Sequence, residues 1–241
     1  SNKWWRRSQF ISTVVLYTGS MRLNKWIAAH SHYSRRKADE LIAAGRVTIN
    51  GHTAGMGVQV TETDKISIDQ KPVQASFNTK TMTLMINKPV GYVCSRKGQG
   101  APTVYSLIPV QFHHLDIVGR LDKDSAGLLL LTNDGELHQR LTHPSYEKEK
   151  VYRVLLSGPL SAEHEAQIKQ GVELTDGISK LGLKALDDTR RYWEVRMHEG
   201  RNRQIRRTFA TLLYGVESLT RFAFGEYTLG TLTSGTYTTL Q

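Results

Sequence analysis

The sequence has a single cysteine, Cys94, among its 241 residues. One cysteine excludes an internal disulfide and a zinc site built from several thiolates. No apolar run approaches the roughly 20 residues that a membrane-spanning helix needs. The basic N-terminal segment also lacks the apolar stretch and small-residue cleavage site of a secretory signal. These absences favour a cytoplasmic protein without a membrane partner.

Several common motifs of catalysis and ligand binding are also missing. The sequence contains no G-x-x-x-x-G-K phosphate loop, no H-E-x-x-H and no G-x-S-x-G. Asp122, Asp124 and Gly127 match three positions of a calcium-binding loop, but position five is Ala126, which has no oxygen ligand, and position twelve is Asn133 rather than the bidentate Glu. The nine histidines show no metal-ligand spacing. The sequence therefore predicts no metal and no other cofactor.

Positive charge is what the sequence has in excess. The 32 Lys and Arg against 22 Asp and Glu give a net charge of +10 and a pI near 9.7. Residues 1–80 hold 12 of the basic and five of the acidic residues, so seven of the ten net charges lie in the first third. This asymmetry predicts two units with different roles and an anionic partner.

The chain is expected to divide into four parts. We expect an extension over residues 1–20, a first domain over 21–70, a linker over 71–82 and a second domain over 83–241. Met21 is the expected natural start, so residues 1–20 are left out of the fold prediction. The linker is predicted from Pro72 and the mostly polar residues that follow it.

The first domain begins with signals for two helices. Apolar residues at helical spacing predict a short amphipathic helix over residues 22–29. Ser34 is suited to cap a second helix that ends at Gly45. Residues 46–51 then alternate as a strand and end in an Asn-Gly turn.

A basic triplet, Arg35, Arg36 and Lys37, occupies the first turn of the expected second helix. Cations are unfavourable at that end of the helix dipole, and a phosphate backbone would supply the missing anion. A solvated charged surface is the alternative interpretation. The nearby cations Arg22, Lys25 and Arg46 favour nucleic-acid contact.

The order of these features resembles a known RNA-binding module. A helix, a Ser-Arg-capped helix, a Gly-Arg-Val strand and an Asn-Gly turn follow one another over residues 21–68. This order is similar to the S-four-like module first described in a small-subunit ribosomal protein. The resemblance implies structured RNA as the partner, but it implies no reaction because the module occurs on several unrelated enzymes.

The second domain is predicted to contain many short strands and few helices. Apolar runs lie at residues 84–86, 92–94, 128–131, 151–156 and 193–197, with helices expected near 160–169 and 204–213. The predicted fold class is α+β. A small helical and strand RNA-binding domain precedes a mixed, mostly antiparallel β-sheet domain with flanking helices.

Four motifs in order carry a second resemblance. Asn-Lys-Pro-Val-Gly opens the domain at residues 87–91, and a long motif from Gly-Arg-Leu-Asp to Thr-Asn-Asp-Gly covers 119–135. Lys-Glu-Lys-Val-Tyr follows at 148–152, and the arginine-rich fourth motif covers 199–207. The domain resembles the RsuA-type family of pseudouridine synthases. With the first module, the resemblance covers nearly all of residues 21–241.

The resemblance implies that Asp122 is the catalytic carboxylate. In this family the N1–C1′ bond of a uridine in RNA breaks, the uracil turns and C5 bonds to C1′, without a metal or redox cofactor. The target base is expected to flip out of its helix into a pocket. Asp122 either attacks the sugar or removes its 2′ proton, and both roles stay open.

Further residues receive roles from the same resemblance. Arg120 is expected to help extrude the base, Tyr152 to stack on the uracil and Arg206 to pair with the aspartate and keep it ionised. Lys88 and Arg203 are expected to contact phosphates. Without the motifs, Asp122 would be an ordinary loop residue, Tyr152 a half-buried strand residue and Arg206 a surface arginine.

The resulting hypothesis is a cytoplasmic, monomeric enzyme that forms pseudouridine in ribosomal RNA of either subunit. Transfer RNA is the alternative substrate. A non-catalytic RNA-binding or ribosome-assembly factor is the alternative from a different functional class, and the first module alone would support it.

Overall fold

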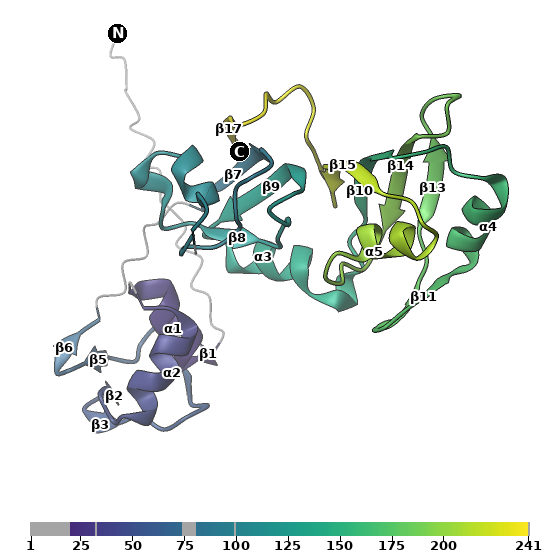
Figure 1. The fold of residues 1–241 in the computed structure, drawn as a ribbon. Coiled ribbons are helices and arrows are strands. Elements are labelled where there is room, and N and C mark those ends of the chain that lie inside the picture. Colours follow the sequence, from purple (N-terminus) through teal and green to yellow (C-terminus); the bar gives the residue numbers. More distant parts are fainter. Residues whose placement is uncertain (1–19, 32, 74–80, 99, 241) are drawn as a thin grey trace, which may run out of the picture. The chain divides into compact units, whose positions relative to one another are not determined.

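The structure is a computed structural model that describes residues 20–31, 33–73, 81–98 and 100–240 (Figure 1). The chain divides into two compact units, residues 1–79 and 80–241. Of the expected N-terminal extension, residues 1–19 lie outside the described residues. Residues 74–80 of the expected linker also lie outside them.

The first unit combines two helices with short strands. The elements are β1 (Met21–Arg22), α1 (Leu23–His30), α2 (Arg35–Ala43), β2 (Val47–Ile49), β3 (His52–Thr53), β4 (Gln59–Val60), β5 (Ile66–Ile68) and β6 (Lys71–Pro72). β1 pairs with β4, and the other strands form a sheet in the order β3-β2-β5-β6. Buried side chains from α1, α2 and the strands share one apolar core. The expected linker therefore begins inside this sheet, because β6 pairs with β5.

The local signals of the first unit are confirmed. The hydroxyl of Ser34 accepts a hydrogen bond from the backbone N–H of Lys37 at 3.2 Å, which caps α2. Asn50 and Gly51 have φ angles of 51° and 87°. Both values lie in the left-handed region that a tight hairpin turn between β2 and β3 requires. The turn residues thus set the register of this hairpin.

The second unit is built on a mixed sheet that has nine strands within the described residues. Its main order is β13-β14-β10-β15-β9-β7-β17, with β8 paired to β9 and β16 paired to β15. The strands are β7 (Thr83–Lys88), β8 (Asp116–Val118), β9 (Ala126–Thr132), β10 (Lys150–Leu156), β13 (Gly182–Ala185), β14 (Tyr192–Met197), β15 (Val216–Phe224), β16 (Tyr227–Thr228) and β17 (Tyr237–Leu240). A separate hairpin pairs β11 (Val172–Leu174) with β12 (Gly177–Ser179).

Three α-helices accompany the strands in the described part of this unit: α3 (Gly135–Thr142), α4 (Ala162–Gln170) and α5 (Gln204–Thr211). Short 3-10 helices cover Val104–Leu107, Val110–Phe112 and Pro144–Tyr146. In the main sheet only β9 and β15 pair in parallel among the described residues. The predicted α+β class with a mixed, mostly antiparallel sheet is confirmed.

The central strands bury side chains on both faces of the sheet. Leu84 and Ile86 of β7 enter a core that also contains residues of α4 and α5, whereas Met85 enters a second core with residues of α3. The four leucines of β9 alternate in the same way, and all four are fully buried. This alternation follows from the two-residue period of a strand. Helices pack on both faces of the sheet and hold β9 rigidly in place. The loop that precedes β9 is therefore anchored at the end where it enters this strand.

Gly127 allows the parallel pair to form. Its φ angle is +106°, and a Cβ atom at this position would lie 2.3 Å from the backbone oxygen of Arg221 on β15. A side chain cannot occupy that space, so β9 and β15 approach each other only because residue 127 is glycine. The approach places β15 directly beside the loop that carries Asp122.

Two local predictions for the second unit need correction. Residues 92–94 do not form a strand; Val93 makes only an isolated bridge with Thr103, because a turn at Gly91 precedes it and bends follow it. The sequence interpretation also missed α3. Asp134 caps this helix by accepting hydrogen bonds from the N–H groups of Glu136 and Leu137.

Candidate active site

The candidate site lies in the loop that leads into β9. Asp122 begins a turn in which its carbonyl oxygen accepts a hydrogen bond from the N–H of Ser125 at 3.1 Å. Lys88 stabilises the turn, because its ammonium donates hydrogen bonds to the carbonyl oxygens of Ser125 at 2.6 Å and Pro89 at 2.9 Å. The turn is therefore fastened to the end of β7.

Lys88 was expected to contact phosphate, but its placement is different. The side chain is fully buried, and burial lowers its pKa. Its donors are directed to backbone carbonyl groups within the protein. The lysine thus holds the loop around Asp122 in shape. Sequence reasoning could not reveal this, because one of the two carbonyl partners, that of Ser125, is 37 residues away in the sequence.

Asp122 itself is accessible. Its side chain is 35% exposed, and its carboxylate oxygen lies 3.9 Å from a guanidinium nitrogen of Arg203. Arg203 directly precedes α5 and has a left-handed backbone, with φ 49°. The carboxylate is therefore open to a ligand on one side and close to a cation on the other.

Asp124 is the more strongly paired carboxylate of this loop. Arg203 binds it with two hydrogen bonds of 2.9 Å each. Arg206 lies 3.2 Å from the same carboxylate through Nε, and it donates to the Asp124 carbonyl oxygen at 2.7 Å. The hydrogen bonds from Arg203 and the charge of Arg206 hold the pKa of Asp124 below its usual range.

The expected pairing of Arg206 with Asp122 is thus not the one observed. Arg206 also donates to the carbonyl oxygen of Val216 on β15 at 2.9 Å, so it ties α5 to β15 and to the loop. Arg203, the expected phosphate contact, is the arginine closer to Asp122. Asp124 was not singled out for this role from the sequence. Its partners are distant in the sequence, and the spacing of the motif alone does not indicate them.

One open cleft of about 1680 Å³ brings several expected residues together. Asp122, Arg120, Tyr152 and Arg203 all line it, whereas Lys88 and Arg206 do not. Tyr152 lies on β10 and is buried except for 8% of its surface. Arg120 is exposed, and within the described residues its side chain makes no hydrogen bond or ion pair. The cleft therefore combines a carboxylate, an aromatic ring and a free cation.

The cleft is strongly cationic. Ten Lys and Arg residues line it against four Asp and Glu residues, although residues 81–241 together are much closer to neutral. Sequence reasoning located positive charge in this unit only at residues 201–207. Folding also brings lysines and arginines of β10, β14, β15 and α4 to the cleft. Such a concentration favours an anionic ligand.

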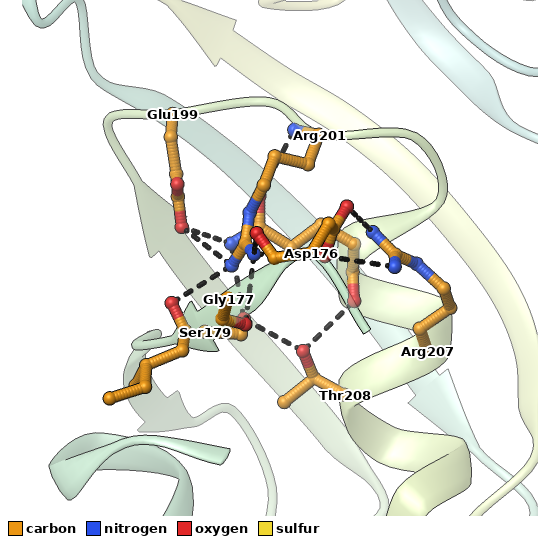
Figure 2. Close-up of polar contacts among 9 residues, drawn as sticks. Asp176, Gly177, Ser179, Glu199, Arg201, Arg207 and Thr208 are labelled. Atoms are coloured by element: carbon orange, nitrogen blue, oxygen red, sulfur yellow. Dashed lines mark hydrogen bonds and ion pairs between the residues drawn. The ribbon is translucent and has the colours of Figure 1, made fainter. Parts of the chain in front are cut away.

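The start of α5 is held by the β11–β12 hairpin (Figure 2). Asp176 at the hairpin turn accepts two hydrogen bonds from Arg207, at 3.0 Å and 2.7 Å, and one from Arg201 at 2.9 Å. The hydrogen bonds from Arg207, together with the charges of Arg207 and Arg201, keep the pKa of Asp176 below its usual range. Gln204 completes the anchor, because its amide donates to Ser179 and to Glu199. The hairpin therefore fixes the helix turn from which Arg203 and Arg206 extend.

In the first unit the expected RNA-contacting residues fall into two groups. Arg22, Lys25, Arg35 and Arg36 are exposed. Lys37 is exposed as well but pairs with Glu40 at 2.8 Å. Arg46 is engaged more fully, with two hydrogen bonds of 2.7 Å and 2.6 Å to Asp69. Among these residues, the charge available to an external anion therefore comes mainly from β1, α1 and the first turn of α2.

The described residues offer neither a metal centre nor a membrane-spanning helix. They contain no cluster of three or more His, Cys, Asp or Glu side chains that could hold a metal ion. Among the helices of the described ranges, none has the length and apolar character to cross a membrane.

Comparison with family models identifies both units. A model of the RNA pseudouridylate synthase family matches residues 82–211, which is more than half of the chain. A model of the S4 domain matches residues 21–66. The two matched ranges lie one in each compact unit.

Individual relatives match over most of their length. The chain is 36% identical over 222 residues to an uncharacterised RNA pseudouridine synthase of Aquifex aeolicus (strain VF5), covering 89% of this chain and 88% of that protein. It is 36% identical over 219 residues to ribosomal large subunit pseudouridine synthase B of Escherichia coli (strain K12), covering 87% of this chain and 75% of the relative. A crystal structure of a pseudouridylate synthase aligns with a TM-score of 0.66 at 33% identity, covering 92% of this chain and 96% of the solved chain.

Proposed function

The chain belongs to the RNA pseudouridylate synthase family, and from this premise we propose that it isomerises a specific uridine of large-subunit ribosomal RNA, with Asp122 as the catalytic carboxylate. The observation that carries the proposal is the position of Asp122. Asp122 lies shortly before the first residue of β9, and its side chain is partly exposed in the cationic cleft. Tyr152 and Arg203 line the same cleft. The ribosomal substrate is supported by the name of the Escherichia coli relative.

The reaction needs little from the protein beyond binding, orientation and one carboxylate. The N1–C1′ bond breaks, the uracil rotates and C5 bonds to C1′, so substrate and product have the same composition. Asp122 acts on the ribose side of this exchange. The carboxylate of Asp122 lies 3.9 Å from a guanidinium nitrogen of Arg203, so a positive charge stands beside it.

Access to the target base requires that the base leaves its stack. Tyr152 offers a largely buried ring in the cleft, on which a flipped uracil can stack. Arg120 is exposed beside Asp122 and is free to enter the space that the base vacates. The exposed cations of the first unit bind another structured part of the RNA that carries the target uridine.

The test is pseudouridine formation on large-subunit ribosomal RNA transcribed in vitro, mapped at single-nucleotide resolution. We expect the wild-type protein to modify one or a few uridines, and Asp122→Asn to abolish the product while it changes RNA affinity by less than about twofold. Asp188→Asn is the matched control. It removes an exposed carboxylate of the same unit that is outside the cleft lining, and it should keep full activity.

The outcomes separate the alternatives. Product on large-subunit RNA with unchanged activity of Asp122→Asn contradicts the catalytic role of this residue. Product only on small-subunit ribosomal RNA or on transfer RNA keeps the reaction and replaces the substrate. Tight RNA binding with no product on any RNA contradicts catalysis and favours a non-catalytic assembly factor.

A further inference from the structure

Two cations share one aromatic ring in the wall of the cleft. The ammonium of Lys150 lies 5.4 Å from the ring centroid of Phe224, and the guanidinium carbon of Arg221 lies 4.8 Å from it. All three residues line the cleft. Lys150 and Phe224 are register partners on the neighbouring strands β10 and β15. The ring stabilises both cations to some extent, but it supplies no counter-charge.

Arg221 is buried without an anionic partner. Only 2% of its surface is exposed, and its Nε donates to the carbonyl oxygen of Leu128 at 2.9 Å. Its Nη2 is buried and has no hydrogen-bond partner among the described residues. No carboxylate of the described ranges lies within 4.0 Å of it. A buried guanidinium in this state is unfavourable, because desolvation of a charge must be offset by a partner.

Lys150 adds a second positive charge, on which the repulsion from Arg221 outweighs the attraction of Glu199. Its ammonium donates to the carbonyl oxygens of Lys148 at 3.2 Å and His198 at 2.9 Å, which leaves one of its three donors unused. Burial lowers the pKa of Lys150, and the nearby charge of Arg221 lowers it further. Two like charges are therefore held together in a partly dehydrated wall. An anion bound at this wall would offset both positive charges.

We propose that Lys150 and Arg221 form an anion subsite that binds a phosphate of the RNA backbone next to the target uridine. The subsite rests on the proposed function and adds to it. Tyr152, on which the uracil is proposed to stack, follows Lys150 by two residues and is the register partner of Arg221. A nucleotide with its base on Tyr152 thus has its own phosphate close to both cations. Arginine and lysine are the side chains that bind phosphate oxygens most strongly.

The experiment compares Arg221→Met and Lys150→Met with the control Arg153→Met in the full chain. Arg153 stacks on Phe222 at 4.1 Å, on the same two strands, but it is exposed and lies outside the cleft lining. The control therefore removes a cation and a cation–π contact without touching the subsite. Affinity for large-subunit ribosomal RNA transcribed in vitro is measured over a series of salt concentrations, together with the melting temperature and the steady-state kinetics.

Each subsite variant should weaken RNA binding about tenfold or more, because a hydrogen bond to a charged group is lost. The slope of log K against log salt should become less negative by about 0.7 to 0.9, the value for one phosphate contact. KM should rise more than kcat falls. The melting temperature of Arg221→Met should not decrease, because the variant removes an uncompensated buried charge. Arg221→Lys keeps the charge and should restore most of the slope.

The opposite pattern would overturn the subsite. A lower melting temperature of Arg221→Met with a wild-type salt slope in the folded fraction would identify a purely structural arginine. If Arg221→Met fails to fold, Lys150→Met decides alone, since Lys150 is only partly buried. A salt slope equal to that of Arg153→Met would then refute the proposal. The proposed function is tested separately, by product formation in the wild type. If no product forms, the salt dependence of RNA binding can still be measured and still tests the subsite.

Discussion

Replacement of Gly127 by alanine should disrupt the contact between β9 and β15. The new Cβ atom would lie 2.3 Å from the oxygen, 2.6 Å from the nitrogen and 2.9 Å from the carbon of the Arg221 backbone. All three are backbone atoms, so no side-chain rotation removes the overlap. The two strands must separate, and the residues of β15 that line the cleft must move with them.

The expected cost has two parts. A non-glycine residue at positive φ costs about 1–2 kcal/mol, and overpacking of a filled interior costs about 1–3 kcal/mol. Gly91→Ala is the matched control, because Gly91 has φ +96° in the same unit but no atom within 4 Å of its added Cβ. Gly127→Ala should therefore destabilise the unit by about 2–5 kcal/mol, and Gly91→Ala by only the first part.

The assay is urea unfolding of the full chain, followed by hydrogen exchange of peptides from β9 and β15. Exchange at these strands reports the second unit alone, which matters because a two-unit chain need not unfold in one step. With an m-value of about 2 kcal/mol/M, the midpoint of Gly127→Ala should fall by about 1–2.5 M. A decrease no larger than that of Gly91→Ala would refute the clash between β9 and β15.

Three further predictions follow from the charged contacts. The lowered pKa of Asp124 stabilises the fold above about pH 4, and this stabilisation is lost as the pH falls through the pKa of Asp124 in the folded protein. The urea midpoints of wild type and Asp124→Asn, measured from pH 7 to pH 2, should therefore converge at low pH. Asp176→Asn should accelerate hydrogen exchange at the start of α5, measured by mass spectrometry, because Arg207 loses its carboxylate partner on the hairpin while Arg201 keeps its bonds to the hairpin carbonyl groups. Replacement of Arg35 and Arg36 by glutamine should flatten the salt dependence of RNA binding more than Arg46→Gln does, because the guanidinium of Arg46 is already paired within the protein.

Each of these predictions has a result that contradicts it. A constant difference in midpoint across the pH range would show that Asp124 does not titrate with a lowered pKa. Unchanged exchange in α5 would mean that Asp176 does not position the helix, and Asp188→Asn serves as the control there. Equal salt slopes for the Arg35/Arg36 double variant and the wild type would mean that the basic triplet is merely solvated.

Local signals in the sequence were sufficient for the first unit. The cap at Ser34 and the Asn-Gly turn involve residues close in the sequence, and both are found where they were expected. The missed helix α3 carries an equally local signal, since Asp134 is a good N-cap and Leu137 and Leu141 are spaced for one buried face. The Thr-Asn-Asp-Gly segment was interpreted as part of a motif, and that interpretation hid the cap.

The site was only partly predictable because its partners are remote in the sequence. The motifs were enough to single out Asp122 and Tyr152, and the structure brings both to one cleft. The partners of Asp124 and the burial of Lys88 depend on strand pairing and on the position of α5, which no local pattern encodes. The same holds for Arg221, whose position in the cleft follows from the glycine opposite it.

The pairing of β7 with β17 affects how the second unit folds. β7 is almost entirely buried, and one of its two edges pairs with β17. In this pair Leu240 is the register partner of Thr83, although the two residues lie near opposite ends of the unit in the sequence. Until β17 is synthesised, a growing chain presents the backbone of β7 as an unpaired edge, which can recruit other strands. Closure of such a distant pair is also slow. The unit is therefore most vulnerable to aggregation late in synthesis, while this edge is still open.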